Sequence, residues 1–338
     1  MKISIFGVGA WATAISLLLH ENGHQVSMWS KFEQEAQLLI ASRKNPLLDG
    51  IEIPEDIYIT TDFDAVTRGA EAVIMAVPSY AVRETADMLK GRISNECIAI
   101  CMSKGIEKDS SALFTDILKK SLGADAKIAS VSGPTHAEEV ARKIPTGCVA
   151  ASEDIAVAER VQDILFNDYF RVYTTTDVVG VELGAALKNV IALCAGICDG
   201  LGFGDNTMAM LMTRGLAEMA ELCVRMGGKK ETLAGLAGLG DLIVTCMSRH
   251  SRNRRAGILM GKGMSASEAM REVGAVVEGY YAAKAAKQLS ESLNVDMPIC
   301  CEAYKVMYED KDPRIAMKEL MTREKKSEDG AGEERWMD

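Results

Sequence analysis

The sequence predicts an α/β protein in which an N-terminal doubly wound, Rossmann-type sheet is followed by an all-helical C-terminal domain. Short apolar runs alternate with amphipathic stretches through the first half of the chain. A glycine-rich turn joins the first apolar run to a helical pattern, and strand-like runs disappear after about residue 177. Strands that alternate with helices in this way form a mostly parallel sheet covered by helices on both faces.

The strands are predicted from short runs rich in β-branched and apolar residues. These runs are residues 2–6, 25–29, 72–77, 97–102, 127–132, 148–152 and 171–175. Amphipathic stretches at residues 10–21, 80–90 and 110–121 lie between several of them and predict helices.

The second half of the chain has a different character. Residues 178–201, VVGVELGAALKNVIALCAGICDGL, and 206–228, NTMAMLMTRGLAEMAELCVRMGG, predict long helices, the first too apolar all round for a surface element. Shorter helical patterns continue to about residue 322. We therefore expect a dinucleotide-binding domain of residues 1–178, a helical substrate and catalytic domain of residues 179–322, and a charged tail of residues 323–338.

Composition narrows the class of protein. The 338 residues include 38 Lys and Arg against 48 Asp and Glu, and the net charge of -10 argues against a general nucleic-acid surface. The chain starts without a secretory pattern, and polar residues interrupt every long apolar run, so we expect a cytoplasmic protein with no membrane insertion. Nine cysteines without a CxxC pair predict buried reduced thiols, and four histidines without metal-ligand spacing predict no metal site.

The turn after the first strand carries a dinucleotide-binding pattern. In IFGVGAWATA, Gly7, Gly9 and Ala12 form a GxGxxA motif directly after a strand and directly before a helix. Gly7 permits the tight turn, Gly9 allows close approach of a pyrophosphate, and Ala12 is small enough for the contact between helix and strand. The pyrophosphate would lie at the helix N-terminus, and the alternative is a glycine turn without a ligand.

The end of the second strand bears on the choice of cofactor. An NAD-selective site has an acidic residue at this position for the ribose hydroxyls, whereas this chain has Ser30 and Lys31 after Trp29. Ser30 and Lys31 suit a 2′-phosphate and favour NADPH. Glu33 is close enough along the chain to keep NADH as an alternative.

Two lysines are candidate site residues for different reasons. Lys188 interrupts the apolar helix GAALKNVIALCAG, so we expect it to face a buried surface or a cleft, with snorkelling to solvent as the alternative. Lys104 follows the strand at 97–102, at the carboxyl end where open α/β sheets bind their ligands.

A third group of polar residues follows glycine-rich turns. Asp241 lies ten residues before Ser251, Arg252 and Asn253, in GLGDLIVTCMSRHSRNRRAG. Thr135 stands at a helix start in VSGPTHAEEV, an arrangement that suits an anion. The Arg–Asn cluster taken alone would be a solvated basic loop, but with the two lysines it describes an anion-binding cleft.

These motifs together resemble the NAD(P)-dependent glycerol-3-phosphate dehydrogenases of the type that supplies bacterial phospholipid synthesis. The resemblance covers roughly residues 2–310 and rests on several blocks in order: GVGAWATA, AVPS, SKGIE, SGPTHAEEVARKIPT, ELGAALKNVIALCAGICDGLGFGDNTMAMLMTRGLAEM, GLAGLGDLIVTC with SRNRRAG, and VVEG. Ala12 stands in place of the usual third glycine and Ala10 in place of a small polar residue, which puts only the cofactor preference in doubt.

The resemblance implies roles for individual residues. Lys188 would transfer the proton, with Asp241 hydrogen-bonded in the same site, and both would contact substrate. Lys104 would contact cofactor and substrate, Gly133 and Thr135 substrate. The substrate-phosphate and cofactor-side residues would be Ser251, Arg252 and Asn253, and the cofactor contacts would be Gly7, Gly9, Ala10, Trp11, Ser30, Lys31, Ala137, Val276 and Glu278, with Arg252 shared.

The function that follows is reduction of dihydroxyacetone phosphate to sn-glycerol 3-phosphate, and the reverse. A hydride from NADPH, or NADH, would reach the carbonyl carbon while Lys188 donates a proton to the oxygen and Asp241 keeps that lysine charged. The partner is a small phosphate substrate, and a homodimer is compatible with the sequence. Two alternatives remain: a related two-domain reductase of a 2-keto or 3-hydroxy acid, and a non-catalytic dinucleotide sensor.

Overall fold

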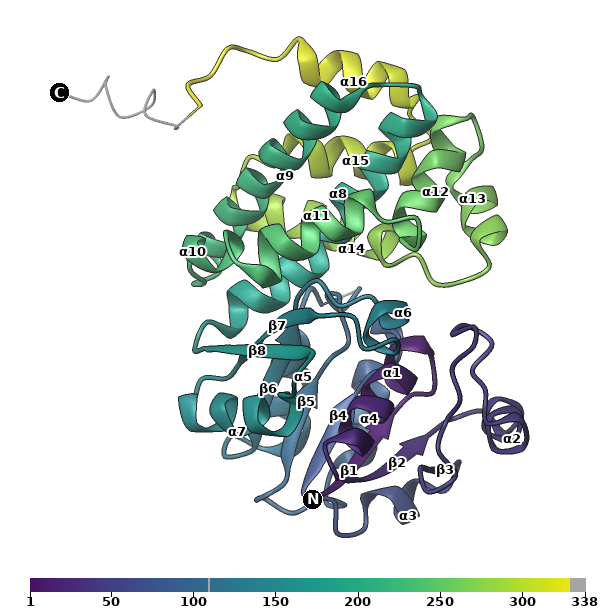
Figure 1. The fold of residues 1–338 in the computed structure, drawn as a ribbon. Helices are drawn as coiled ribbons and strands as arrows, with labels where there is room; N and C mark the ends of the chain where they lie inside the picture. Colours follow the sequence, from purple (N-terminus) through teal and green to yellow (C-terminus); the bar gives the residue numbers. More distant parts are fainter. Residues whose placement is uncertain (109, 329–338) are drawn as a thin grey trace, which may run out of the picture.

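The computed structural model describes residues 1–108 and 110–328, and it has a sheet half and a helical half stacked end to end (Figure 1). The tail predicted at residues 323–338 lies outside the described residues from position 329 on. The strands are β1 Lys2–Phe6, β2 Gln25–Trp29, β3 Tyr58–Thr60, β4 Ala72–Met75, β5 Ile98–Cys101, β6 Lys127–Ser132, β7 Thr146–Ala151 and β8 Phe170–Thr175. The predicted fold class is confirmed.

Most helices of the sheet half lie between strands, and the rest of the chain is helical. Those of the sheet half are α1 Ala10–Glu21, α2 Glu33–Ser42, α3 Phe63–Thr67, α4 Val82–Leu89, α5 Phe114–Leu122, α6 Ala137–Val140 and α7 Ile155–Leu165. Those of the helical half are α8 Val178–Gly200, α9 Asp205–Arg225, α10 Lys230–Leu233, α11 Asp241–Met247, α12 Arg252–Gly261, α13 Ala266–Val273, α14 Glu278–Leu293, α15 Pro298–Tyr308 and α16 Pro313–Met321. A 3₁₀ turn at Ser79–Ala81 precedes α4, and a π-helical turn at Leu236–Gly240 precedes α11.

The sheet has the strand order β3-β2-β1-β4-β5-β6-β7-β8. Strands β1 to β6 pair in parallel, whereas β7 pairs antiparallel with β6 and parallel with β8. The order reverses between β1 and β4, so their connections leave in opposite directions and open a crevice at the carboxyl ends.

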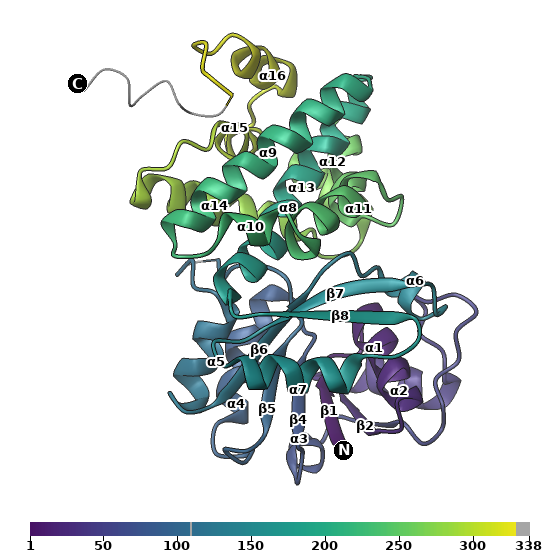
Figure 2. The same cartoon turned by 60° about the vertical axis from the view of Figure 1, so that its left-hand side comes forward.

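Both faces of the sheet are apolar because its strands are covered on both sides. In β1, Ile3 and Ile5 face the core formed with α1, α2 and α7, and Phe6 faces the core formed with α3, α4 and α5. Figure 2, turned from the first view, shows α7 running below β8 on one side of the sheet.

Several elements differ from the sequence prediction. The strand expected at 72–77 ends at Met75, and the helix expected at 110–121 begins at Phe114. Helices α2 and α7 and the three-residue β3 are additional. The pattern of α7 was readable, because Val157, Val161 and Ile164 are buried at helical spacing.

Helix α8 is the core of the helical half. By length and composition it could cross a membrane, but 83% of its most apolar window is buried inside the fold, as in the core helix of a globular domain. Its first turn is capped by Asp177, whose carboxylate accepts hydrogen bonds from the backbone N–H groups of Gly180 and Lys229. All nine cysteines lie in the described part of the chain as free thiols, and the predicted burial holds for all of them but Cys301.

Helices α8 and α12 cross in close contact. A Cβ atom at Gly257 on α12 would collide with the carbonyl oxygen of Leu193 and with Gly196 on α8. The same holds for Gly196, whose missing side chain admits the backbone of Arg254. Glycine at the crossing therefore lets the two backbones touch, which brings the start of α12 beside the middle of α8.

We expect Gly257→Ala to lower the free energy of unfolding by about 1–3 kcal/mol or more, because a methyl group in this contact overpacks it. Chemical unfolding followed by circular dichroism measures the change. Gly204→Ala is the matched control, since Gly204 has a φ of -94° and open space around it. It should cost less than about 1 kcal/mol, and equal losses in both variants would contradict the close crossing.

Candidate active site

A cleft of about 790 Å³ separates the carboxyl edge of the sheet from helices of the other half. It receives the segments that follow β1, β2, β4, β5 and β6, together with parts of α8, α11, α12 and α14. The predicted site residues that line it are Gly7, Gly9, Ala10, Trp11, Ser30, Lys31, Lys104, Thr135, Ala137, Lys188, Ser251, Arg252, Asn253, Val276 and Glu278. The remaining two, Gly133 and Asp241, lie behind them and bond to Lys104.

The glycine-rich turn between β1 and α1 is shaped for a dinucleotide. Gly7 has a φ of +120°, and a Cβ atom there would lie 2.6 Å from the carbonyl oxygen of Ala76 at the end of β4. Gly9, the N-cap of α1, faces open space, and it has no side chain to occupy the free N–H groups of the first turn. Trp11 Nε1 is buried without a hydrogen-bond partner among the described residues. These features fit a bound pyrophosphate.

Behind the wall of the cleft, one carboxylate is shared by two lysines that line it. Lys188 Nζ on α8 lies 2.5 Å from Asp241 Oδ1, and Lys104 Nζ, after β5, lies 2.8 Å from Asp241 Oδ2. Lys188 is 5% exposed and Asp241 1%, so the pair is shielded from water. Lys104 also donates to the carbonyl oxygen of Gly133 at 2.9 Å and to Thr135 Oγ1 at 3.4 Å.

The pKa values of these groups are set by burial and by each other. Burial lowers the pKa of the Lys188 ammonium, the charge of Asp241 raises it and Lys104 lowers it again, which leaves that pKa at about 8. Burial works to raise the pKa of Asp241, but the two lysines hold it below its ordinary value. Near neutral pH the centre therefore carries two ammonium groups and one carboxylate, and its net charge attracts an anion.

The Arg–Asn cluster divides into buried and open groups. Ser251 caps α12, with its Oγ accepting from the backbone N–H of Arg254, while Asn253 donates to Asn189 Oδ1 at 2.9 Å and accepts from the N–H of Gly279 at 2.8 Å. Arg252 is exposed to the cleft and forms no ion pair or hydrogen bond within the described ranges. Arg252 therefore offers a free guanidinium to the cleft beside the buried Ser251 and Asn253.

Three further predicted cofactor residues, Ser30, Lys31 and Glu278, line the cleft and already have hydrogen-bond partners. Glu278, at the start of α14, accepts a hydrogen bond from the backbone N–H of Ser79, and burial raises the pKa of its carboxyl. Lys31, after β2, is held by both carboxylate oxygens of Glu84 at 2.6 and 2.7 Å. Ser30 is buried, and its hydroxyl donates to Glu35 Oε2 at 3.0 Å. Glu33, considered above for NADH, instead bonds to Thr61 and Gln37.

Sequence reasoning missed three residues of the site. Thr245 Oγ1 accepts from Lys188 Nζ at 2.9 Å and donates to the carbonyl oxygen of Asp241, and its place one helical turn after Asp241 was a usable signal. Asn189 holds Asn253. His136 lines the cleft with its Nε2 buried and without a partner in the described chain, and burial and the two lysines lower its pKa.

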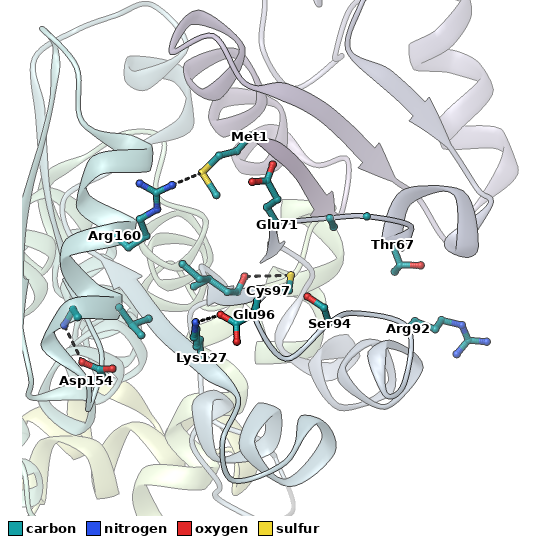
Figure 3. Close-up of a pocket in the computed structure, with 15 residues that line it drawn as sticks. Met1, Thr67, Glu71, Arg92, Ser94, Glu96, Cys97, Lys127, Asp154 and Arg160 are labelled. Carbon is teal, nitrogen blue, oxygen red and sulfur yellow. Dashed lines mark hydrogen bonds and ion pairs between the residues drawn. The ribbon is translucent and has the colours of Figure 1, made fainter.

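A second cavity, of about 530 Å³, lies at the opposite edge of the sheet (Figure 3). It is bordered by the residues just before β1 and β4, Met1 and Glu71, and by the first residues of β5 and β6, Ile98 and Lys127, so it faces the amino ends of the strands. Two of its cationic side chains already have partners: Lys127 pairs with Glu96 at 2.5 Å, and Arg160 donates to the sulfur of Met1. Ligands of open α/β sheets bind at the carboxyl ends, which favours the larger cleft as the active site.

Comparison with known proteins gives matches along nearly the whole chain. Residues 2–158 match the model of the NAD-dependent glycerol-3-phosphate dehydrogenase N-terminus, and residues 177–318 match that of the C-terminus. Glycerol-3-phosphate dehydrogenase [NAD(P)+] of Thermoanaerobacter sp. is 48% identical over 328 residues, covering 97% of this chain and 99% of the relative. The relative of the same name from Agathobacter rectalis is 47% identical over 328 residues, with 97% of each chain covered.

A solved structure shows the same arrangement. Glycerol-3-phosphate dehydrogenase from Coxiella burnetii superposes with a TM-score of 0.91 at 36% identity, over 95% of this chain and 98% of that one. The likeness includes both the sheet half and the helical half.

We expect Asp241→Asn to lower the pKa of Lys188 further, because the carboxylate is the group that raises it. The pH dependence of Lys188 modification by a small amine-reactive reagent, read by mass spectrometry, measures this pKa. Glu96→Gln, in the distant second cavity, is the control and should leave it unchanged. An unaltered pKa in Asp241→Asn would show that burial alone sets the charge of Lys188.

Proposed function

Since the chain belongs to the NAD-dependent glycerol-3-phosphate dehydrogenase family, we propose that Lys188, Asp241 and Lys104 form its reaction centre. The protein is an NAD(P)-dependent oxidoreductase that interconverts dihydroxyacetone phosphate and sn-glycerol 3-phosphate. The observation that carries the assignment of the site is the shared carboxylate between two lysines, in a cleft whose other wall exposes Arg252.

The chemistry follows from what these side chains can do. A bound nicotinamide cofactor supplies the hydride for the C2 carbon of the ketone. Lys188 Nζ stabilises the charge that develops on the C2 oxygen and transfers its proton there. Asp241 keeps Lys188 protonated through the 2.5 Å contact, and Thr245 fixes the direction of the ammonium group. In the reverse direction neutral Lys188 accepts the hydroxyl proton.

The substrate phosphate is assigned to the start of α12. Arg252 can form a bidentate, charge-assisted contact with a phosphate dianion. Ser251 retains its hydroxyl proton after accepting from Arg254, and Asn253 retains one amide hydrogen after bonding to Asn189, so each has a donor left. On the other side, Thr135 and Gly133 hold Lys104 in place beside the reacting oxygen.

The two alternatives from the sequence are weakened to different degrees. A reductase of 2-keto or 3-hydroxy acids would need a carboxylate site, whereas family membership favours the phosphate substrate. A non-catalytic sensor would keep Lys188 and Asp241 as a structural ion pair. Thr245 and Lys104 converge on the same pair within the cleft, which favours a reaction centre.

The roles of the two domains, the cofactor, the biological role and the oligomeric state are further proposals. We propose residues 1–178 as the dinucleotide-binding domain and 179–322 as the substrate domain, supported by the end of β8 at Thr175 and the start of α8 at Val178. NADPH, with NADH as the second cofactor, is compatible with the NAD(P)+ in the names of the two relatives. Supply of glycerol 3-phosphate for phospholipid synthesis in the cytoplasm and assembly as a homodimer stay predictions, the last to be checked by light scattering.

The pH dependence should identify Lys188 as the proton-transferring group. For reduction, kcat/KM should fall as pH rises through about 8, because Lys188 then loses the proton that it must donate. For oxidation it should rise through the same range, because neutral Lys188 is the base. Steady-state assays in both directions measure the two profiles.

In Lys188→Ala, turnover should fall by a factor on the order of 10² or more and the break near pH 8 should vanish, while cofactor binding persists. Lys127→Ala removes a lysine from the second cavity and should keep both the rate and the profile. Near-normal turnover without Lys188 would restore the structural ion-pair alternative.

Arg252→Ala tests the phosphate site. Loss of one charge-assisted contact is worth roughly 1.5–3 kcal/mol, so kcat/KM for dihydroxyacetone phosphate should fall by about tenfold to more than a hundredfold. Unphosphorylated dihydroxyacetone is the control substrate and should lose far less. Equal fractional losses for the two substrates would mean that the phosphate is held elsewhere.

A further inference from the structure

The end of β2 has more negative charge around it than its own residues supply, because Glu84 from α4 lies beside it. Lys31 is its one cation, and both oxygens of the Glu84 carboxylate hold it. Ser30, which is 2% exposed, donates its hydroxyl proton to Glu35 and accepts from the backbone N–H of Phe32. Glu35 and Glu84 both line the same cleft as Lys31. The tip therefore presents one ammonium group and two carboxylates.

The two cofactors place different demands on such a tip. The 2′-phosphate of NADPH requires cations and free donors, whereas the ribose hydroxyls of NADH require a carboxylate that accepts their protons. Ser30 is buried and its hydroxyl is engaged at both donor and acceptor, so Lys31 is the remaining group at this tip for a phosphate. The ammonium of Lys31 is already neutralised by Glu84.

We propose that Glu84, from the helix after β4, sets the preference between NADPH and NADH by competing with the 2′-phosphate for Lys31. The proposal rests on the dehydrogenase function above, since that function brings a nicotinamide dinucleotide into the cleft. When Lys31 turns to a 2′-phosphate, Glu84 loses its partner and faces a second anion. With a ribose diol at the tip, the pair stays closed and carboxylate oxygens remain to accept hydroxyl protons.

The Glu84 side chain is suited to this competition. It lies in the first turn of α4, where the helix N-terminus stabilises a negative charge without Lys31. The side chains of Lys31 and Glu84 are 51% and 56% exposed, so water screens their attraction and the pair opens readily. The competition therefore weakens the preference for NADPH that Lys31 alone would give, without abolishing it, and both cofactors can be accepted.

The test compares Glu84→Gln, Lys31→Met and the double variant. Calorimetric dissociation constants are measured for adenosine 2′,5′-bisphosphate and adenosine 5′-monophosphate, which differ in the 2′-phosphate, and for NADPH and NADH. Glu84→Gln should tighten the bisphosphate by about two- to tenfold, the range expected for release of an exposed ion pair and of one repulsion. Binding of the monophosphate should change less than twofold. Without Lys31, the same Glu84 substitution should have a smaller effect.

Glu96→Gln is the matched control, because Glu96 pairs with Lys127 at the far edge of the sheet (Figure 3). It should leave all four dissociation constants unchanged. Glu84→Ala is a second variant should the glutamine variant fold poorly, as judged by its Tm. Equal changes for bisphosphate and monophosphate, or no change in either, would overturn the proposal.

The dehydrogenase function itself is tested by a separate measurement, the turnover of dihydroxyacetone phosphate. If the wild-type protein does not reduce dihydroxyacetone phosphate with NADPH or with NADH, the dehydrogenase function is refuted. A shift in the bisphosphate-to-monophosphate ratio would still support Glu84 as the discriminating residue of the cleft, because that ratio does not depend on turnover.

Discussion

The proposed reaction centre depends on one buried carboxylate, Asp241, which bridges the two halves of the molecule. It bonds to Lys188 from the helical half and to Lys104 from the sheet half, and it is 1% exposed. A lone carboxylate at that depth would cost several kcal/mol, so its two cations are a requirement of its burial. Because the cations outnumber it, the centre keeps a positive charge that a phosphate substrate or a developing alkoxide can neutralise. The same contacts that compensate the burial of the carboxylate therefore give the proposed site its attraction for an anion.

The rest of the fold holds these three side chains at fixed separations. Lys188 projects from α8, which is packed on all sides, and so its backbone has little freedom to move. Asp241 begins α11 directly after a π-helical turn, and such turns occur often at functional sites. The glycine contact at Gly257 seats α12 against α8, which places Arg252 at the rim of the cleft. Close packing in the helical half is thus what gives the phosphate end of the cleft its geometry.

The fold class, most strands and the separate site residues Lys104 and Lys188 could be predicted from sequence, since each has a local signal, whereas the pairing of Lys188 with Asp241 was implied only by the family resemblance. The glycine turn, the apolar helix interrupted by Lys188 and the strand-to-loop position of Lys104 are visible in short windows. Partnerships between distant residues are not visible there. Glu84 meets Lys31 only because β4 lies beside β1 and so brings the start of α4 to the end of β2. Asn253 resembled a free phosphate donor, yet half of its hydrogen-bonding capacity is used by Asn189 and Gly279, which only the tertiary contact of α8, α12 and α14 shows.

The balance between cations and carboxylates changes along the cleft, and no single sequence motif shows this change. At the reaction centre two lysines face one aspartate, and Arg252 adds an unpaired cation beside them. At the end of β2 the balance is reversed, with Glu35 and Glu84 against Lys31. Between the two ends lies the N-terminus of α1, whose free N–H groups and dipole suit a pyrophosphate. A dinucleotide with its anionic part in the middle would thereby be held at α1, and its adenosine end would meet the end of β2, where Glu84 competes for Lys31 in our proposal. The positive charge at the opposite end would attract a phosphorylated three-carbon substrate and bring it next to Lys188, the proposed proton donor.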